Sequence, residues 1–229
     1  MSRRHLNTTK LEIIQVATEM FVNNGYSNTS IKAIADELGL STGHVTFYFP
    51  TKEHLLAVLV EMLCGFQWSE LRHNVEEGKT SLFAICIELA VMVSTCETNE
   101  IAKDFYRAAY THSIPLDIIR KNDIERAKIV FSEYCPDWTD EDFRIAETLV
   151  SGVEYSSMAK TDNSPSLENR IIGAINNIMT IYNVPEEVKK ININKILSLD
   201  FVNLGKNMLN EFSEYVKIIN EQTLEEMFN

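Results

Sequence analysis

Apolar residues recur at helical spacing along most of this chain, and no stretch alternates convincingly over the length of a β-strand. In residues 11–24, the apolar positions that share one helical face are Ile13, Ile14, Ala17, Met20 and Phe21. Gly25 then provides a natural C-terminal stop, because glycine tolerates the left-handed conformation that ends many helices. The pattern predicts an all-α protein.

Glycine, proline and short polar stretches divide the chain into successive predicted helices. The first four are expected over residues 11–24, 31–38, 42–49 and 52–76. Further helices are expected over residues 80–97, 99–112, 115–134, 139–160, 166–183, 186–199 and 201–222.

Charge is distributed unevenly along the 229 residues. Residues 1–56 hold five Lys or Arg and five Asp or Glu, so the whole net charge of −12 arises after residue 56. A neutral N-terminal part joined to an acidic remainder indicates two roles in one chain. We predict two domains, over residues 1–51 and 52–229. The acidic field of the second would oppose non-specific adhesion to phosphate.

The segment IADELGLSTGHVTFYFPTKEHLL, residues 34–56, places short polar residues next to aromatic ones. Ala35 is small where two helices would cross, and Gly39 permits a positive φ at the turn between them. The helix over 42–49 would present hydroxyls, an imidazole, a glycine and aromatic rings to a DNA groove. The residues concerned are Thr42, Gly43, His44, Thr46, Phe47 and Tyr48. An ordinary helical hairpin inside a bundle has the same spacing, so spacing alone leaves both interpretations open.

Residues 11–56 resemble the DNA-binding domain of the TetR family of bacterial transcriptional regulators. The family pattern is a Gly-aromatic pair, a Thr-rich loop, Ile-Ala, Gly-hydrophobic-Ser, a further Gly, an aromatic cluster, and Lys-Glu before two leucines. In this chain the pattern is formed by Gly25-Tyr26, Thr29-Ser30, Ile34-Ala35, Gly39-Leu40-Ser41, Gly43, Phe47-Tyr48-Phe49, Lys52-Glu53 and Leu55-Leu56. The match covers about a fifth of the chain.

The resemblance implies a role in DNA binding for ten residues. Thr29, Ser30 and Lys32 would hold backbone phosphates, and Lys52 would clamp a further phosphate. Thr42, Gly43, His44 and Thr46 would face the major groove, while Phe47 and Tyr48 would contact sugar-phosphate or a thymine methyl. His44 and Thr46 depart from the family, which usually has a small hydroxyl residue and a tyrosine there. The operator sequence therefore does not follow from the resemblance.

The resemblance also implies a helical C-terminal domain that forms a homodimer and holds an apolar cavity for a small effector. Effector binding there would separate the two DNA-binding domains. Candidate cavity residues are Phe66, Phe83, Tyr106, Tyr110, His112, Trp138, Tyr155 and Met158. Ordinary core packing explains each of these side chains equally well. The many glutamates are expected on solvated helical faces.

Two segments are candidates for the dimer interface. One is Ile145–Met158, which contains the small pair Ser151-Gly152. The other is Leu167–Tyr182, where Ile171, Ile175, Ile178 and Met179 form an apolar stripe. Packing within one protomer is the alternative explanation for that stripe. Residues beyond Pro185 extend past the usual family length.

Other classes of protein fit the sequence less well. The five histidines are scattered, and no HxxxH pair, GxSxG motif or phosphate-binding loop is present. We therefore expect no enzyme, no cofactor and no metal site. Four separated cysteines among apolar neighbours, without an apolar leader, indicate a cytoplasmic protein with no membrane span. The prediction is a repressor that binds a palindromic operator as a dimer and is released by a small apolar or amphipathic effector. The alternative is a ligand-independent structural or activator DNA-binding protein of the same fold.

Overall fold

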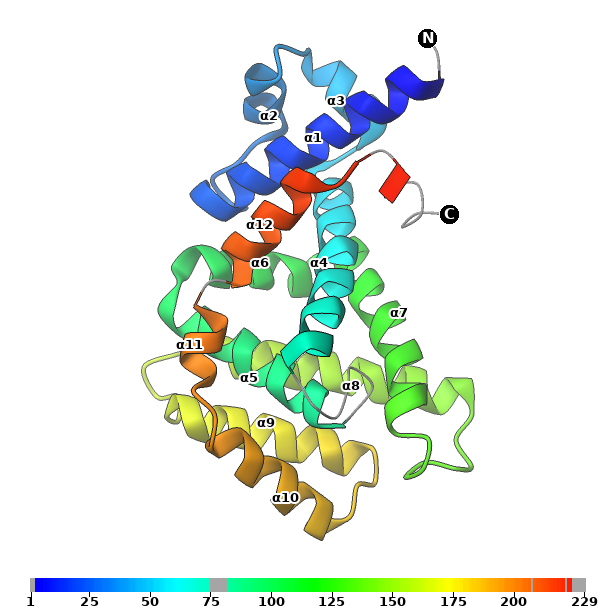
Figure 1. Cartoon of the computed structure of the whole chain (residues 1–229), viewed down its shortest axis with the longest axis vertical. Helices are drawn as coiled ribbons and strands as arrows, with labels where there is room; N and C mark the ends of the chain where they lie inside the picture. Colours follow the sequence, from blue (N-terminus) through cyan, green and yellow to red (C-terminus); the bar gives the residue numbers. More distant parts are fainter. Residues whose placement is uncertain (1–2, 75–81, 207, 221, 224–229) are drawn as a thin grey trace.

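The computed structural model describes residues 3–74, 82–206, 208–220 and 222–223, and within these ranges every regular element is an α-helix. The all-α prediction is therefore confirmed for the described part of the chain. Three helices form the head: α1 (Arg3–Asn24), α2 (Ile31–Glu37) and α3 (Thr42–Tyr48). The head lies at one end of an elongated molecule (Figure 1).

The other helices form the body. The first, α4 (Lys52–Asn74), runs from the head into the body and packs against α7 (Figure 1). The others are α5 (Leu82–Thr98), α6 (Glu100–Thr111), α7 (Ser113–Val130), α8 (Asp140–Met158), α9 (Leu167–Ile181), α10 (Glu186–Leu197), α11 (Phe201–Gly205) and α12 (Met208–Ile218). The central element is α5, which is apolar on nearly every face because α6, α8, α9, α10 and α11 all pack against it.

Two predicted helices differ from the structure. The first helix begins at Arg3 and not at residue 11, so Thr9 is a buried residue within the helix. The predicted helix over 201–222 is divided into α11 and α12. Residues 75 and 76 of the predicted fourth helix, and 80 and 81 of the fifth, lie outside the described residues.

The division after α11 follows from a close approach between Gly205 and α5. A Cβ atom at Gly205 would lie 2.9 Å from the carbonyl oxygen of Val91 and 2.5 Å from Oγ1 of Thr95. The Thr95 hydroxyl donates a hydrogen bond to the Gly205 carbonyl, at 3.0 Å. Only glycine fits this position without a shift of the backbone.

The last helix, α12, returns to the head and joins it to the body. It packs against both α1 and α4 (Figure 1). The side-chain amide of Gln15 on α1 donates to the carbonyls of Val216 and Lys217, each at 3.2 Å. Phe212 is fully buried, with its ring 5.9 Å from that of Phe66 on α4. The segment beyond Pro185 therefore contributes to the core of the protein.

The apolar stripe on α9 is not a dimer surface. Its four members, Ile171, Ile175, Ile178 and Met179, are all buried within the protomer. They face inward because α9 packs on α5 and α8. Of the two explanations left open for this stripe, the structure supports packing within one protomer, and the stripe is no longer a candidate dimer surface. Of the described helices, none has both the length and the apolar composition needed to cross a membrane.

Replacing Phe212 with Ala tests the contribution of α12. We expect the Phe212→Ala variant to lose ~3–5 kcal/mol of unfolding free energy, because a fully buried aromatic ring leaves a cavity. Ile218→Ala on the same helix removes an exposed side chain and should change stability by less than about 0.5 kcal/mol. Urea denaturation followed by circular dichroism measures both values, and equal effects would contradict the proposed packing of α12.

Candidate nucleic-acid interface and ligand cavity

Helices α2 and α3 form a helix-turn-helix whose ends are fixed by local hydrogen bonds. Ser30 caps α2 by accepting from the amide of Ala33, at 3.1 Å. Ser41 caps α3 by accepting from the amide of His44, at 3.2 Å. Gly39 has a φ of +64° in the turn between the helices, as predicted for a glycine there. The two helices pack directly on one another.

One face of α3 is left open to solvent. Val45 and Phe49 point into the head and are buried. Thr42 and Gly43 are exposed, and His44, Thr46 and Tyr48 are half-buried. Phe47 is 73% exposed, which is unusual for a large aromatic ring. The rings of His44 and Tyr48 stack at 6.0 Å, so α3 presents hydroxyls, an imidazole and aromatic rings on one face.

The three residues predicted to hold phosphates differ in their surroundings. Ser30 is exposed, and its cap bond uses an oxygen lone pair, so its proton remains available. Lys32 is exposed and pairs only with Asp36 on the same helix, at 2.5 Å. Thr29 is 1% exposed, and its hydroxyl donates to the carbonyl of Gly25 at 2.9 Å. The prediction for Thr29 is corrected, because a buried and committed hydroxyl does not reach a phosphate.

Lys52 holds the loop between α1 and α2. Its ammonium group donates to the carbonyls of Tyr26 and Thr29, each at 3.0 Å, and lies 3.9 Å from the centre of the Tyr26 ring. Burial lowers the pKa of Lys52, although Glu53 and Asp104 oppose this effect. Lys52 is thus directed toward the protein, and we do not retain it as a phosphate contact.

Helix α6 holds the same loop from the other side. The carboxylate of Asp104 accepts from the amide of Ser27 at 2.7 Å and from its hydroxyl at 2.5 Å. Burial opposes ionisation of Asp104, but these bonds and Arg107 lower its pKa below the usual value. His112 stacks edge-on against Tyr26, with ring centres 5.5 Å apart. The head is therefore attached to α4, α6 and α12.

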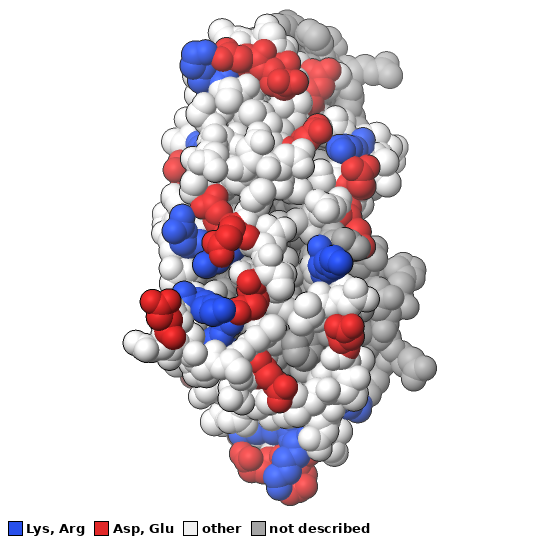
Figure 2. Space-filling view, turned by 90° about the vertical axis from the view of Figure 1, so that its left-hand side faces the viewer, with Lys and Arg blue, Asp and Glu red and all other residues white. Residues whose placement is uncertain are grey.

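The net charge of −12 offers little general attraction to nucleic acid. On the face drawn in Figure 2, the described Lys and Arg residues lie among Asp and Glu and form no continuous basic surface. Several of the cations pair along their own helix, including Lys103 with Glu100 and Arg107 with Asp104. Contacts from the open face of α3 would therefore have to supply most of any affinity for DNA.

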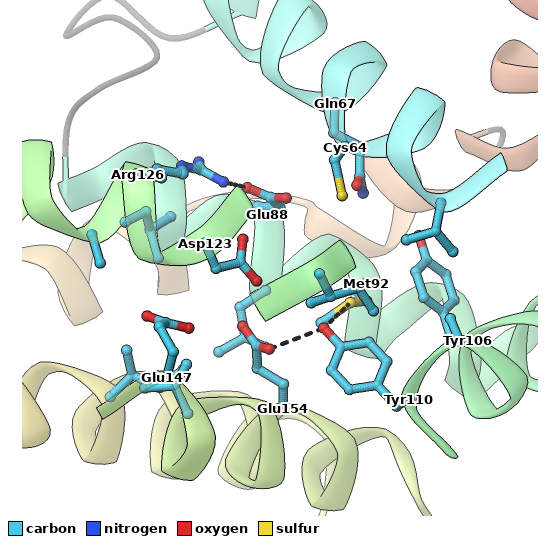
Figure 3. Close-up of a pocket in the computed structure, with 18 of the residues that line it drawn as sticks. Cys64, Gln67, Glu88, Met92, Tyr106, Tyr110, Asp123, Arg126, Glu147 and Glu154 are labelled. Carbon is cyan, nitrogen blue, oxygen red and sulfur yellow. Dashed lines mark hydrogen bonds and ion pairs between the residues drawn. The ribbon is translucent and has the colours of Figure 1, made fainter. Parts of the chain in front are cut away.

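The body contains a cavity lined by residues of α4, α5, α6, α7, α8 and α9 and of the segments that follow α7 and α9, with a free volume of about 70 Å³. Its apolar walls include Leu63, Leu89, Phe105 and Val150, and its polar walls include Cys64, Gln67, Tyr106 and Tyr110 (Figure 3). Because a cavity of ~10–15 Å³ on this measure holds one water molecule, this one has room for several or for a small ligand.

Two of the eight predicted cavity residues, Tyr106 and Tyr110, line this cavity. The structure does not bring the other six to it, because their side chains are used elsewhere. Phe66 packs on α12, Phe83 lies 5.1 Å from the ammonium of Lys195, and His112 lies at the joint with the head. Trp138 packs on Phe143 and Tyr182, Met158 is core, and Tyr155 is a half-buried residue outside the lining.

The sequence analysis missed the carboxylates of the cavity: Glu88, Asp123, Glu147 and Glu154. Glu147 is 3% exposed, so the expectation of solvated glutamates is wrong at that position. A signal was present, because Glu147, Val150 and Glu154 share one helical face at spacings of three, four and seven. Two acidic residues on a face with a buried valine are unusual, since carboxylates rarely point into a core.

These carboxylates titrate abnormally because the protein encloses them. Burial, together with the neighbouring Glu147, raises the pKa of Glu154 to about 8. Burial raises the pKa of Glu147 to about 7, although the hydrogen bond from Tyr182 opposes this effect. Burial and the same two glutamates raise the pKa of Asp123 well above its usual value. The cavity therefore binds protons that a solvated set of carboxylates would release.

These features define a helix-turn-helix DNA-binding protein with a separate helical body. Residues 13–59 match the family described as bacterial regulatory proteins, tetR family. The N-terminal region of this chain is therefore a DNA-binding region of the TetR type.

Three curated proteins of Bacillus subtilis strain 168 are similar to part of the chain. YuxN, an uncharacterized HTH-type transcriptional regulator, is 46% identical over 80 residues, or 35% of this chain and 28% of that protein. YerO, described in the same words, is 33% identical over 72 residues, or 31% and 25%. The fatty acid metabolism regulator protein is 28% identical over 71 residues, or 31% and 37%. The matches therefore span only about a quarter to a third of these relatives.

Among solved structures, the crystal structure of Mycobacterium smegmatis AmtR is similar over 82% of this chain and 93% of that chain. Its sequence identity is 19%, and its TM-score is 0.40.

Replacing Glu154 with Gln tests the state of the buried carboxylates. The folded protein keeps a proton on Glu154 up to about pH 8, whereas the unfolded chain releases it near pH 4.5. The native state therefore binds more protons in this window, and the free energy of unfolding falls as the pH rises. We expect Glu154→Gln to raise the melting temperature by roughly 5 °C at pH 8 and by less at pH 5.

Glutamine keeps an oxygen that accepts the hydrogen bond from Tyr110, which Glu154 accepts at 2.9 Å. The control is Glu141→Gln, an exposed glutamate on the same helix that pairs with Arg144. Differential scanning fluorimetry between pH 5 and pH 8 compares the two variants. A stabilisation by Glu154→Gln that does not depend on pH would show that Glu154 is ionised throughout this range.

Proposed function

We propose that this protein is a homodimeric transcriptional repressor that binds a palindromic operator and leaves it when a small molecule occupies the body cavity. The observation that carries the DNA-binding part is the open face of α3, where Phe47 stays 73% exposed beside Thr42 and His44. Folding alone gives no reason to expose that ring, whereas contact with a thymine methyl or a sugar would bury it.

Exposed apolar residues on α8 support the homodimer. Ile145 and Leu149 lie one turn apart, are each more than half exposed, and are followed on that side by the exposed Gly152. A second copy that packs on this face would bury both side chains, and Gly152 would allow the two helices to approach closely. This surface replaces the buried stripe on α9 as the candidate interface.

The arrangement of helices supports a connection between the cavity and the head. Helix α6 supplies Phe105, Tyr106 and Tyr110 to the cavity wall, while its Asp104 holds Ser27 in the head. Helix α4 likewise lines the cavity and holds the head through Lys52. A ligand that favours a different spacing of α4 and α6 would change the distance between the two heads of a dimer. The heads must lie about 34 Å apart to use successive major grooves.

Replacing His44 tests the DNA contact. We expect His44→Ala to change base preference at one operator position, by ~1–3 kcal/mol, because His44 lies on the open face of α3. The measurement is a titration against DNA from upstream of the protein's own gene, at two salt concentrations, with a scrambled competitor. His54→Ala is the matched control, since His54 lies on α4 and contacts Thr51. An unchanged preference in the His44 variant would place this side chain outside the groove.

Replacing Leu149 tests the dimer surface. We expect Leu149→Glu to convert the dimer to a monomer, because the variant buries two carboxylates in a symmetric interface. Operator binding should then weaken in parallel. Ile191→Glu is the control, since Ile191 is similarly exposed, at 54%, but lies on α10. Analytical ultracentrifugation measures the oligomeric state, and a dimer that survives Leu149→Glu would exclude this face.

A further inference from the structure

The cavity in the body carries more negative than positive groups. Among the residues that the structure describes, Arg126 is the one Lys or Arg side chain that lines the cavity, and its guanidinium donates to the carboxylate of Glu88. Asp123 from α7 and Glu147 and Glu154 from α8 remain as additional carboxyl groups. Figure 3 shows these three carboxyl groups directed toward the same space.

One of these carboxyl groups has an oxygen without a partner. The hydroxyl of Tyr182 donates to Oε1 of Glu147, but Oε2 is buried and has no hydrogen-bond partner among the described residues. Glu147 is buried almost completely, so bulk water does not supply that partner. An unsatisfied buried carboxylate oxygen is costly, and an ion or another donor that reaches it removes this cost.

The arrangement of the carboxyl groups favours an organic cation over a metal ion. No group of three or more His, Cys, Asp or Glu side chains in the described part of the chain is arranged to hold a metal ion. An ammonium group does not need acceptors as close together as the side chains around a metal ion. Its three N–H donors can each reach a separate acceptor at hydrogen-bond distance. Tyr110 and Tyr182 add aromatic surface of the kind that binds cations.

The size of the cavity restricts the ligand further. Its free volume of about 70 Å³ is roughly half of the ~150 Å³ that accommodates benzene in an engineered protein cavity. A slender aliphatic chain fits this space better than an aromatic ring does. The walls formed by Leu63, Leu89 and Val150 would cover its methylene groups.

We propose that the cavity binds a short aliphatic amine as its ammonium ion, with Asp123, Glu147 and Glu154 as the anionic partners. The cation supplies the missing partner of Glu147 and offsets the repulsion among the three carboxylates. In the absence of the amine, protons bound to these carboxyl groups reduce the repulsion among them. The amine is the effector in the function proposed above, and in this respect the inference rests on that function.

Binding is tested with four small probes of equal carbon number: 1-aminobutane, 1,4-diaminobutane, 1-butanol and butyrate. Isothermal titration calorimetry and thermal shift are measured at constant ionic strength, with probe concentrations up to the millimolar range. We expect the two amines to bind and to raise the melting temperature, and the alcohol and the acid to do neither. Equal binding of 1-butanol and 1-aminobutane, or no binding of any probe, would overturn the proposal.

Variants of the carboxylates locate the site. Glu147→Gln and Glu154→Gln should each weaken amine binding by roughly tenfold or more, because each loses an ionic partner in an enclosed site. Both should fold, since glutamine is a neutral isostere of each glutamate. Glu141→Gln on the exposed side of α8 is the matched control and should bind amine like the unaltered protein. Unchanged affinity in both cavity variants would place the amine elsewhere and contradict the proposal.

Operator DNA separates this inference from the proposed function. Amine binding that is lost in Glu154→Gln, with no effect on operator binding, would support the site and contradict its role in release. A protein that binds no specific DNA but binds the amines in the cavity would contradict the repressor and leave the amine site supported. Release of operator by amines from the unaltered protein, and not from Glu154→Gln, would support both.

Discussion

The position of the head depends on how the loop between α1 and α2 is held. This loop has few apolar side chains, and its attachment consists mainly of polar contacts to the body: the Lys52 ammonium on two carbonyls, and the Asp104 carboxylate on Ser27. Gly25 makes the approach of Asp104 possible, because it has a φ of +88° and a Cβ atom there would lie 3.2 Å from that carboxylate. Such contacts can exchange partners at moderate cost, which suits a joint between two parts that move relative to one another.

The cavity lies next to this joint in the structure. Helices α4 and α6 each contribute side chains to the cavity and a polar group to the loop, so a change in their spacing reaches the head without an intermediate element. The carboxylates of the cavity reduce stability in the unliganded protein, since burial disfavours their charge. A cationic ligand that pairs with these carboxylates would remove this cost. The free energy gained in this way would then be available to drive a change in conformation.

Local sequence features predicted much of the head. Ser30, Gly39 and Ser41 act through their own backbone conformation or through amides three residues away, so their roles are readable from the chain alone. Lys52 was interpreted wrongly because its position depends on distant contacts, to the carbonyls of Tyr26 and Thr29. Thr29 was interpreted wrongly for a local reason, since its hydroxyl donates to the carbonyl of Gly25 within the same loop. In the body, most of the aromatic residues predicted to line a cavity pack elsewhere. The sequence does not separate the two cases, because an aromatic side chain makes the same kind of contacts in a core and in a cavity wall.

The sequence by itself determined the all-α class, the helix-turn-helix and the buried and open faces of α3, because helical periodicity, caps and glycine turns act over a few residues. Only the tertiary structure decided that α12 returns to the head, that the α9 stripe is internal, and that carboxylates from α5, α7 and α8 meet in one cavity. These features join residues far apart in the chain, and the packing of whole helices selects them. The same glutamate would be solvated or buried depending on which neighbour covers its face.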